Sequence, residues 1–383
     1  MQYDKQLRIL QIGESWTSDR IGGMNRYFAS LVTSLLESGI KVKGLVIGST
    51  KAEEITRGAV KSFGFNKGNL LSKFLMIHNY FKKNVNVENF DVIVSHFSLF
   101  TFPLLPLFKN KPLIIHFHGP FAFEGEVEKK KSLGNFAKYY IEKTVYNRGC
   151  NFITLSRAFK NILAEKYKID PKKIEVIPGG VDCNKFSVNL SREEARKKLN
   201  LPQNRPIIVA VRRIVKRMGL ENLIESIKTV KDSHPDVLLL IAGKGVLLEE
   251  LNQRIISLGL EENVRMLGFV PDEDLPVLYR AANLSIVPTV ELEGFGLIVL
   301  ESLASGTPVL VTPIGGLPET IEKFRPDLIL SSSSIESLSK GINDALSGKL
   351  KLPLQEECIN YVKNNHDWTI ISKQIYEFYE KFM

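Results

Sequence analysis

Residues 284–313 read LSIVPTVELEGFGLIVLESLASGTPVLVTP, and the pattern of this stretch decides the fold. The apolar run at 284–288 predicts a short buried strand. A helix is expected to begin near Phe295 or Gly296 and to end at the following Ser-Gly step, before a second strand at 307–313. A strand, a helix and another strand in this order are typical of a right-handed β-α-β unit with parallel strands.

The same alternation of short apolar runs and helical patterns fills the rest of the chain. Further strand-like runs lie at 8–13, 41–48, 91–96, 113–119, 151–156 and 174–178, and then at 206–211, 237–243 and 264–270. Short buried strands separated by helices indicate parallel sheets covered on both faces. We therefore predict an α/β protein with two doubly wound, Rossmann-like domains that face one another across a ligand-binding cleft.

A polar, proline-containing stretch at 187–206 interrupts this rhythm and marks a domain boundary. A chain of 383 residues also exceeds what a single hydrophobic core usually organises. We predict an N-terminal domain over 1–186, a C-terminal domain over 187–365 and a last helix within 366–383. Packing of this helix back on the N-terminal domain is one arrangement that the sequence allows.

The composition is that of a globular protein, with 44% hydrophobic and 24% charged residues. No apolar run approaches the roughly 20 residues that a membrane-spanning helix requires. The N-terminus leads directly into a strand-like run, so we expect no cleavable signal peptide. The three cysteines have no metal-type spacing and fit a reducing, cytoplasmic compartment.

Positive charge is concentrated in the first half of the chain. Residues 1–190 carry 28 Lys and Arg against 16 Asp and Glu, whereas the remainder carries 23 against 26. An anionic membrane surface would attract such a half, and the apolar stretches at 69–81 and 97–108 are compatible with peripheral association. A solvated basic face explains the charge as well. No base-reading module is present, so we expect no nucleic-acid partner.

Two carboxylates, Glu293 and Glu301, bracket the predicted start of the helix at Gly296. A helix N-terminus with glycines nearby suits a phosphate, which a carboxylate would repel. Neutral hydroxyls are therefore the expected ligands of Glu293, because an ionised carboxylate accepts several hydrogen bonds. Glu301 lies five residues beyond Gly296, or roughly 7–8 Å along a helix. A nucleotide sugar, with a diphosphate between two hydroxyl-bearing ends, fits this spacing.

The longer segment 284–319, ending in VLVTPIGGLPE, strongly resembles the signature of family 4 retaining glycosyltransferases, also called group 1 glycosyl transferases, which have the GT-B fold. The similarity extends over most of the chain. It includes IGGMNRYFASL at 21–31, IEVIPGGVDCNKF at 174–186, LLIAGKGVLLEEL at 239–251 and VRMLGFVPDEDLPVLYRAANLSIVP at 264–288.

This resemblance implies transfer of a sugar from a nucleoside-diphosphate sugar, with retention at the anomeric carbon. It implies that Glu293 contacts hydroxyls of the transferred sugar and that Glu301 binds the ribose. The backbone of Phe295, Gly296 and Leu297 would hold the distal phosphate. Gly22 and Gly23 would let the backbone of the N-terminal domain approach the same phosphates.

The family also uses a basic pair after the first strand of the second domain to neutralise the leaving diphosphate. Its arginine matches Arg213, but its lysine position is Met218, which cannot neutralise a phosphate. We expect Arg217, or alternatively Lys216, to supply the second charge. Three arginines and a lysine within six residues favour anion binding over a merely solvated loop.

Two histidines, His116 and His118, lie at the end of the strand at 113–119. By resemblance, His118 faces the donor sugar near the reaction centre and is, with Glu293, the catalytic candidate. His116 points to the same side in an ideal strand, but a structural role is the simpler interpretation for it.

The resemblance thus predicts a hexosyltransferase that acts on a carbohydrate or lipid-linked hydroxyl acceptor in cell-surface polysaccharide, lipopolysaccharide or glycolipid synthesis. The expected donor is a UDP- or GDP-sugar, without a metal or other cofactor. The alternative is a catalytically silent, nucleotide-sugar-binding partner subunit. A Rossmann-type dehydrogenase lacks support, because no G-x-G-x-x-G follows the first strand.

Overall fold

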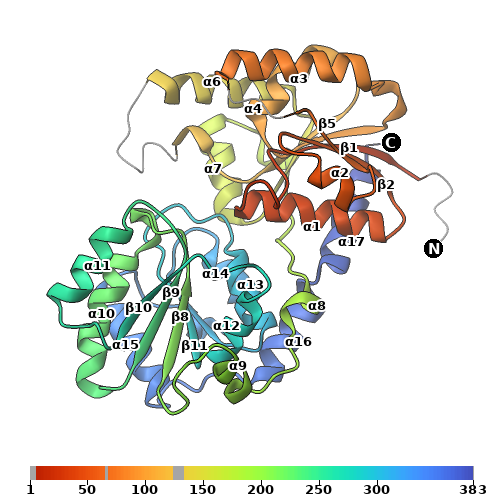
Figure 1. Cartoon of the computed structure of the whole chain (residues 1–383). Helices are drawn as coiled ribbons and strands as arrows, with labels where there is room; N and C mark the ends of the chain where they lie inside the picture. The colour runs from red at the N-terminus through yellow and green to blue at the C-terminus, as the bar shows by residue number, and fades with distance from the viewer. Residues whose placement is uncertain (1–5, 65–67, 124–132, 383) are drawn as a thin grey trace. The chain divides into compact units, whose positions relative to one another are not determined.

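The computed structural model describes residues 6–64, 68–123 and 133–382. The chain divides into two compact units, each of which contains one parallel β-sheet (Figure 1). Unit 1 comprises Met1–Gly179 and Trp368–Met383, and unit 2 comprises Gly180–Asp367. The prediction of two parallel, doubly wound α/β domains is confirmed.

The sheet of unit 1 has the strand order β3-β2-β1-β4-β5-β6-β7, and all of its pairs are parallel. Its strands are short and mostly buried, as expected for a sheet covered on both faces. They are β1 Arg8–Ile12, β2 Lys41–Val46, β3 Val60–Ser62, β4 Val92–Ser95, β5 Leu113–Phe117, β6 Asn151–Thr154 and β7 Ile174–Val176. The edge strand β3 was not predicted, because three residues are too few to show a period.

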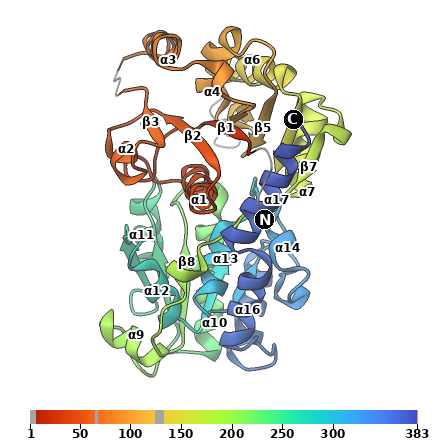
Figure 2. The same cartoon turned by 90° about the vertical axis from the view of Figure 1, so that its right-hand side faces the viewer.

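The helices of unit 1 lie on both faces of this sheet, with α3, α4 and α6 on one side and α1 and α17 on the other (Figure 2). α1 buries Tyr27, Phe28, Leu31 and Leu35, which recur at helical spacing. The helices are α1 Gly23–Glu37, α2 Lys51–Ile55, α3 Leu70–Asn84, α4 Ser98–Thr101, α6 Leu133–Arg148, α7 Arg157–Tyr167 and α17 Trp368–Glu380, with short 3-10 helices at η1 Val87–Asn89, η2 Phe102–Leu107 and η3 Pro171–Lys173.

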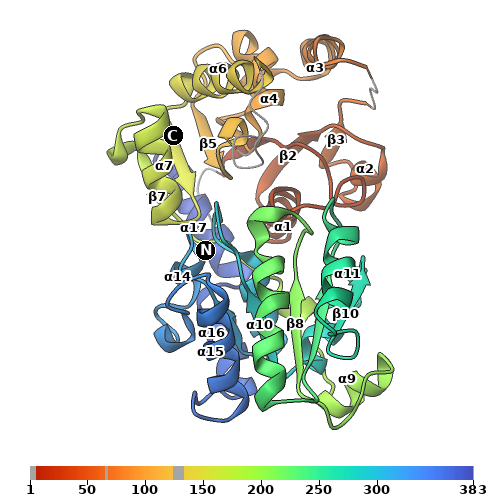
Figure 3. The same cartoon turned by 90° about the vertical axis from the view of Figure 1, so that its left-hand side faces the viewer.

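Unit 2 has a five-stranded parallel sheet in the order β10-β9-β8-β11-β12. Helices α10, α11 and α15 lie on one side of it and α12, α13 and α16 on the other (Figures 1 and 3). The strands are β8 Ile207–Val211, β9 Leu238–Ala242, β10 Val264–Gly268, β11 Leu284–Val287 and β12 Val309–Val311. The helices are α8 Cys183–Phe186, α9 Arg192–Lys198, α10 Leu220–Ser233, α11 Leu248–Ser257, α12 Leu275–Ala281, α13 Leu297–Ala304, α14 Leu317–Ile321, α15 Ile335–Leu346 and α16 Gln355–Asn365, with η4 Lys216–Met218 and η5 Pro326–Leu328.

The domain boundary lies after Gly179, whereas the sequence places it after residue 186. The difference is the segment that contains α8. Asp182 caps this helix by accepting a hydrogen bond from the backbone N–H of Lys185, and α8 packs on α12, α13 and α16, so it belongs to unit 2. The polar stretch that marks the boundary in the sequence is the surface segment around α9.

The C-terminal helix α17 belongs to unit 1 and packs on α1. Ser34 of α1 anchors it through its hydroxyl, which lies 2.8 Å from the hydroxyl of Ser372 and 3.2 Å from the carbonyl oxygen of Trp368. Unit 1 is therefore built from two chain segments that are far apart in the sequence. Among the described helices, none has both the length and the apolar character needed to cross a bilayer.

Candidate functional site

In the sheet of unit 2, the order in which the chain adds its strands reverses between the neighbouring strands β8 and β11. From β8 the chain continues to β9 on one side, and from β11 it continues to β12 on the other. In open parallel sheets, ligands bind beyond the carboxyl ends of the strands at such a point. The two segments that leave β8 and β11 here are residues 212–219 and 288–296.

A buried ion pair joins these two segments. Arg212 directly follows β8, and its side chain is 6% exposed, whereas that of Glu293 is 15% exposed. The guanidinium Nη2 of Arg212 lies 2.5 Å from Glu293 Oε2, 2.5 Å from Thr289 Oγ1 and 2.6 Å from Met218 Sδ. Thr289 also donates to the same carboxylate oxygen at 3.3 Å.

This environment keeps Glu293 ionised. Burial by itself raises the pKa of a carboxyl group, but the charge and hydrogen bond of Arg212, together with Arg217 and Thr289, lower the pKa of Glu293 below its ordinary value. The carboxylate is consequently held in place as a hydrogen-bond acceptor. Such a group can orient hydroxyls, as the sequence predicts.

The backbone around Glu293 is held by contacts that need glycine. The carbonyl oxygen of Glu293 accepts a hydrogen bond from the N–H of Gly316 at 2.9 Å. A Cβ at Gly315 would lie 2.1 Å from that oxygen, so no side chain fits there. Leu292 adopts a positive φ of 52°, and its carbonyl oxygen accepts a hydrogen bond from Arg217 Nη1 at 2.7 Å.

Helix α13 begins at Leu297, with Gly296 as its N-cap residue at a φ of 89°. No side chain caps this helix, and its first turn contains no acidic residue. Its amide groups and positive dipole end are therefore suited to an anion. Phe295 and Glu301 are both buried. The roles of Phe295, Gly296 and Leu297 at the phosphate and of Glu301 at the ribose stay predictions.

The basic segment after β8 divides into buried and exposed side chains. Arg212, Arg217 and Met218 are buried, whereas Arg213 and Lys216 are exposed. The sequence predicts phosphate contacts for Arg213 and for Arg217 or Lys216. It does not single out Arg212, which is the residue that contacts Glu293. The one available signal was the pair of consecutive arginines, because neighbouring residues in extended backbone point to opposite sides.

In the sheet of unit 1, the order in which the chain adds its strands reverses between the neighbouring strands β1 and β4. Gly22 is the N-cap residue of α1 and Gly23 is its first residue. A Cβ at either position would meet no described atom within 4 Å. Packing among the described residues does not require these glycines, which is consistent with their predicted role near a phosphate.

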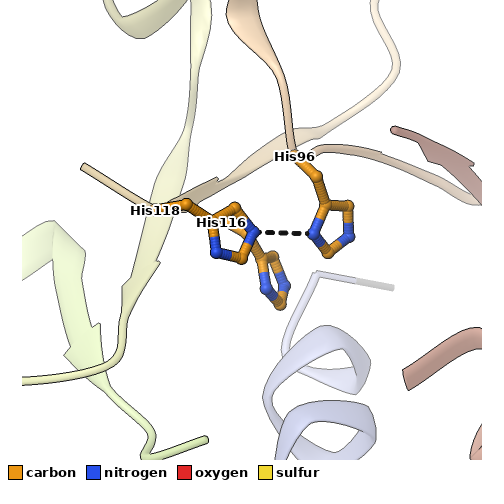
Figure 4. Close-up of side chains that lie close together, drawn as sticks. All are labelled: His96, His116 and His118. Atoms are coloured by element: carbon orange, nitrogen blue, oxygen red, sulfur yellow. Dashed lines mark hydrogen bonds between the residues drawn. The ribbon is translucent and has the colours of Figure 1, made fainter. Parts of the chain in front are cut away.

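Three histidines lie together at the carboxyl edge of β4 and β5 (Figure 4). His96 follows β4, His116 lies in β5 and His118 follows β5. His96 Nδ1 is 3.0 Å from His118 Nε2, and His96 Nε2 is 2.5 Å from the side-chain oxygen of Gln11 in β1. The ring centroids of His96 and His116 are 4.4 Å apart.

This hydrogen-bond chain sets the proton positions. The amide oxygen of Gln11 only accepts, so His96 donates from Nε2 and accepts at Nδ1. His118 then donates from Nε2, which leaves a lone pair on Nδ1. Within the described residues, His118 Nδ1 has no hydrogen-bond partner, and His118 is only partly buried. The structure therefore gives His118 one nitrogen that can accept a hydrogen bond from a ligand.

His116 is more deeply buried and has protein partners at both nitrogens. Its Nε2 is 2.6 Å from the hydroxyl of Tyr379, and its Nδ1 is 3.3 Å from the hydroxyl of Tyr27. Burial lowers the pKa of His96 and His116 well below the ordinary value and lowers the pKa of His118 to about 3. All three imidazoles are neutral at neutral pH.

Neutral imidazoles are also metal ligands, and one nitrogen of each ring lies within 4.8 Å of the others. However, five of the six ring nitrogens already have a hydrogen-bond partner in the protein. A metal ion at this cluster would have to displace the His96–His118 hydrogen bond.

Comparisons with known proteins connect both units to one family. Residues 191–365 match the family described as "Glycosyl transferases group 1", and residues 21–185 match the one described as "Glycosyltransferase Family 4". An uncharacterized glycosyltransferase of Methanocaldococcus jannaschii is 29% identical over 238 residues. That match covers 60% of this chain and only 60% of the relative.

Solved structures extend the similarity over nearly the whole chain. A glycosyltransferase from Rickettsia africae has a TM-score of 0.74 at 25% identity and covers 99% of both chains. Anabaena HepE in complex with UDP-glucose has a TM-score of 0.79 at 19% identity and covers 98% of this chain and 100% of its own. The chain therefore belongs to glycosyltransferase family 4, the group 1 glycosyl transferases, and has the GT-B fold.

Proposed function

We propose that the protein is a retaining glycosyltransferase that transfers a sugar from a nucleoside-diphosphate sugar to a hydroxyl acceptor. The observation that carries this proposal is the ionised Glu293, held by Arg212 at the switch point of unit 2 and three residues before Gly296, the N-cap residue of α13. A carboxylate for sugar hydroxyls and helix amides for phosphate are the two features that such a donor needs.

The proposed reaction breaks the bond between the anomeric carbon and the donor phosphate oxygen and forms a bond from that carbon to the acceptor oxygen. The acceptor's proton passes to the departing phosphate, and attack from the same face retains the configuration. Negative charge grows on the diphosphate during this step, so fixed amides and cations beside it lower the barrier.

In unit 1 we assign His118 to the transferred sugar. Its Nδ1 lone pair can accept a hydrogen bond from a sugar hydroxyl, because Nε2 is committed to His96. The neutral ring suits this role better than general acid catalysis, since burial keeps its pKa near 3.

A panel of nucleotide sugars, tested first by thermal shift and then by turnover, examines this function. The correct donor should raise the melting temperature, and UDP-sugars and GDP-sugars form the first two sets. Turnover should follow when carbohydrate and lipid-linked acceptors are supplied. If a donor binds but is neither transferred nor slowly hydrolysed, the silent partner subunit is favoured instead. If no nucleotide sugar binds, the transferase and the silent subunit are both rejected.

The place of action that we propose is the cytoplasmic face of a membrane, in the synthesis of a cell-surface polysaccharide or glycolipid. The observation in favour is an apolar face on α3 and α6, both of which pack on η2. Five large side chains on it are 42–72% exposed, namely Leu70, Leu71, Leu75, Phe136 and Tyr140. Lysines on the same helices, such as Lys73 and Lys138, could reach anionic headgroups.

Co-sedimentation with vesicles tests this location. Vesicles with phosphatidylglycerol should retain the protein at low salt, and those of phosphatidylcholine alone should retain much less. Leu71→Glu with Leu75→Glu should abolish binding, whereas Ile256→Glu, at a 56% exposed apolar position of unit 2, should not. Equal retention of all three proteins would exclude this face as the attachment site.

A further inference from the structure

We propose that Arg212 is the cation that binds the donor's diphosphate in unit 2 and that it replaces the lysine which relatives carry at the position of Met218. The inference rests on the proposed function, because it names a residue of the same donor site. Neither the sequence resemblance nor the comparisons assign a role to this arginine.

The first support is the unused hydrogen-bonding capacity of Arg212. A guanidinium has five N–H donors in a planar fork. The contacts of Arg212 described above all involve Nη2, and its buried Nε has no hydrogen-bond partner among the described residues. Nη2 donates to Glu293 and Thr289, so the N–H groups of Nη1 are the remaining ones for which the described residues supply no acceptor. A phosphate oxygen can accept a hydrogen bond from Nη1, and the charge of the guanidinium strengthens that bond.

The second support is the position of the guanidinium beside Met218. Arg212 Nη2 lies 2.6 Å from Met218 Sδ. The arginine from the end of β8 therefore brings its charge to the place that a side chain at position 218 occupies. A lysine at position 218 would place a second positive charge against this guanidinium, and the two charges would repel each other. A methionine at this position is compatible with Arg212.

The other cations of the segment are less suited to this task. Arg217 donates a hydrogen bond from Nη1 to the carbonyl oxygen of Leu292 and so holds the Glu293 segment in place. Lys216 is exposed on η4. Arg213 is exposed and next to Arg212 in the chain, and it can serve as the second member of a basic pair.

The third support is the partner of Arg212. Through Glu293, the guanidinium is tied to the segment that leads into Gly296 and the start of α13. Arg212 contributes charge and hydrogen bonds to the departing diphosphate, whose new charge it balances, and it transfers no proton.

The test uses calorimetric titration of the full chain with inorganic pyrophosphate, UDP and GDP. Arg212→Met should weaken binding of the preferred diphosphate by about 10- to 100-fold, the effect of losing a hydrogen-bonded charge. Lys228→Met, which removes an exposed charge from α10 of the same unit, should change it less than about twofold. Arg212→Lys keeps the charge next to Glu293 and covers the case in which Arg212→Met does not fold. It should bind the diphosphate more weakly than wild type, because an ammonium does not reproduce the shape and the number of donors of a guanidinium.

A rescue experiment separates a specific role from general damage. Arg212→Gly should lose binding, and Arg212→Gly combined with Met218→Lys should recover most of it, because the lysine ammonium replaces the lost guanidinium. Met218→Lys alone should lower the melting temperature through like-charge repulsion. Wild-type affinity in Arg212→Met, or a double variant no better than Arg212→Gly, would overturn the inference.

The outcomes also distinguish this inference from the proposed function. Donor binding and turnover that do not depend on Arg212 would leave the function standing and reject the inference. Pyrophosphate binding that depends on Arg212, without binding of any nucleotide sugar, would support the inference and reject the function. Absence of binding by every diphosphate would reject both.

Discussion

Glu293 and Arg212 form a buried pair, so removing one partner leaves an uncompensated charge in unit 2. Glu293→Gln should lower the free energy of unfolding of unit 2 by about 3 kcal/mol and should reduce turnover roughly 100-fold. Chemical unfolding and steady-state kinetics measure the two effects. Glu291→Gln is the matched control, because Glu291 is exposed two residues away. A Glu293→Gln variant with unchanged turnover would remove Glu293 from the catalytic site.

The three clustered histidines, two of them buried and His118 partly buried, make unit 1 sensitive to acid. Their pKa values are lowered in the folded protein, so below pH 6.5 the unfolded chain binds more protons than the folded one. The free energy of unfolding should therefore decrease as the pH falls from about 6.5 toward 3. At pH 5.5 it should be lower than at neutral pH by about 1.4 kcal/mol for each histidine. Urea unfolding at pH 7.5 and 5.5 measures this loss.

His96→Asn is the control for this pH effect. It removes one titrating ring, so the loss between pH 7.5 and 5.5 should shrink by about 1.4 kcal/mol. Equal stability of the wild type at the two pH values would show that the rings are not buried in neutral form.

The hydrogen bonds of the histidine cluster also predict its metal content. Five ring nitrogens already have protein partners, so purified protein should contain far less than one transition-metal ion per chain by mass spectrometry. Nitrogen NMR of labelled histidine should show His118 protonated at Nε2. One zinc per chain, lost in a His96→Asn variant, would instead identify the cluster as a metal site.

At the scale of elements, Glu142 of α6 anchors Phe121 and Ala122, which follow His118 in the chain, through hydrogen bonds. Its carboxylate accepts hydrogen bonds from the N–H groups of Phe121 and Ala122, both at 3.1 Å, and from the hydroxyls of Tyr146 at 3.2 Å and Tyr167 at 2.6 Å. Burial raises the pKa of Glu142, although these hydrogen bonds oppose the rise. One buried side chain thus connects α6 and α7 to the end of β5.

Glu142→Leu should destabilise unit 1 by about 2–4 kcal/mol, because it leaves buried donors without an acceptor. Chemical unfolding measures the loss, and hydrogen exchange at Ala122 should become faster. Glu165→Leu on α7, at an exposed position, should change neither. Unchanged protection of Ala122 in Glu142→Leu would show that the segment is held in another way.

The start of α13 shows how far local patterns reach. The sequence predicts a helix start near Phe295 or Gly296, and the helix begins at Leu297 with Gly296 as N-cap. Glycine at a helix boundary and apolar residues after it are local signals, so the element could be predicted. The close approach of Gly315 to the carbonyl oxygen of Glu293 could not, because it joins segments that are distant in the chain.

At the scale of the whole molecule, the last helix completes unit 1 after the chain has built unit 2. α17 buries six large side chains in unit 1: Trp368, Ile371, Ile375, Tyr376, Phe378 and Tyr379. At about 2 kcal/mol for each, this burial is on the order of the whole stability of a typical domain.

A chain that ends at Asp367 should therefore lose the fold of unit 1 and keep that of unit 2. Limited proteolysis should then digest unit 1 and leave a resistant fragment near residues 180–367. A chain that ends at Glu380 retains α17 and should resist proteolysis in both units. A resistant unit 1 in the shorter chain would show that α17 is dispensable.

Sequence alone determined the fold class, the strand-and-helix order and the family, because periodicity, turn residues and motif spacing are local properties of the chain. It also identified Glu293, Glu301 and His118 as candidate site residues. Only the tertiary structure decided which arginine contacts Glu293, that Gln11 and His96 orient His118, and that α17 returns to unit 1. These facts depend on side chains from separate strands meeting at one sheet edge, and the spacing of residues along the chain does not encode that meeting.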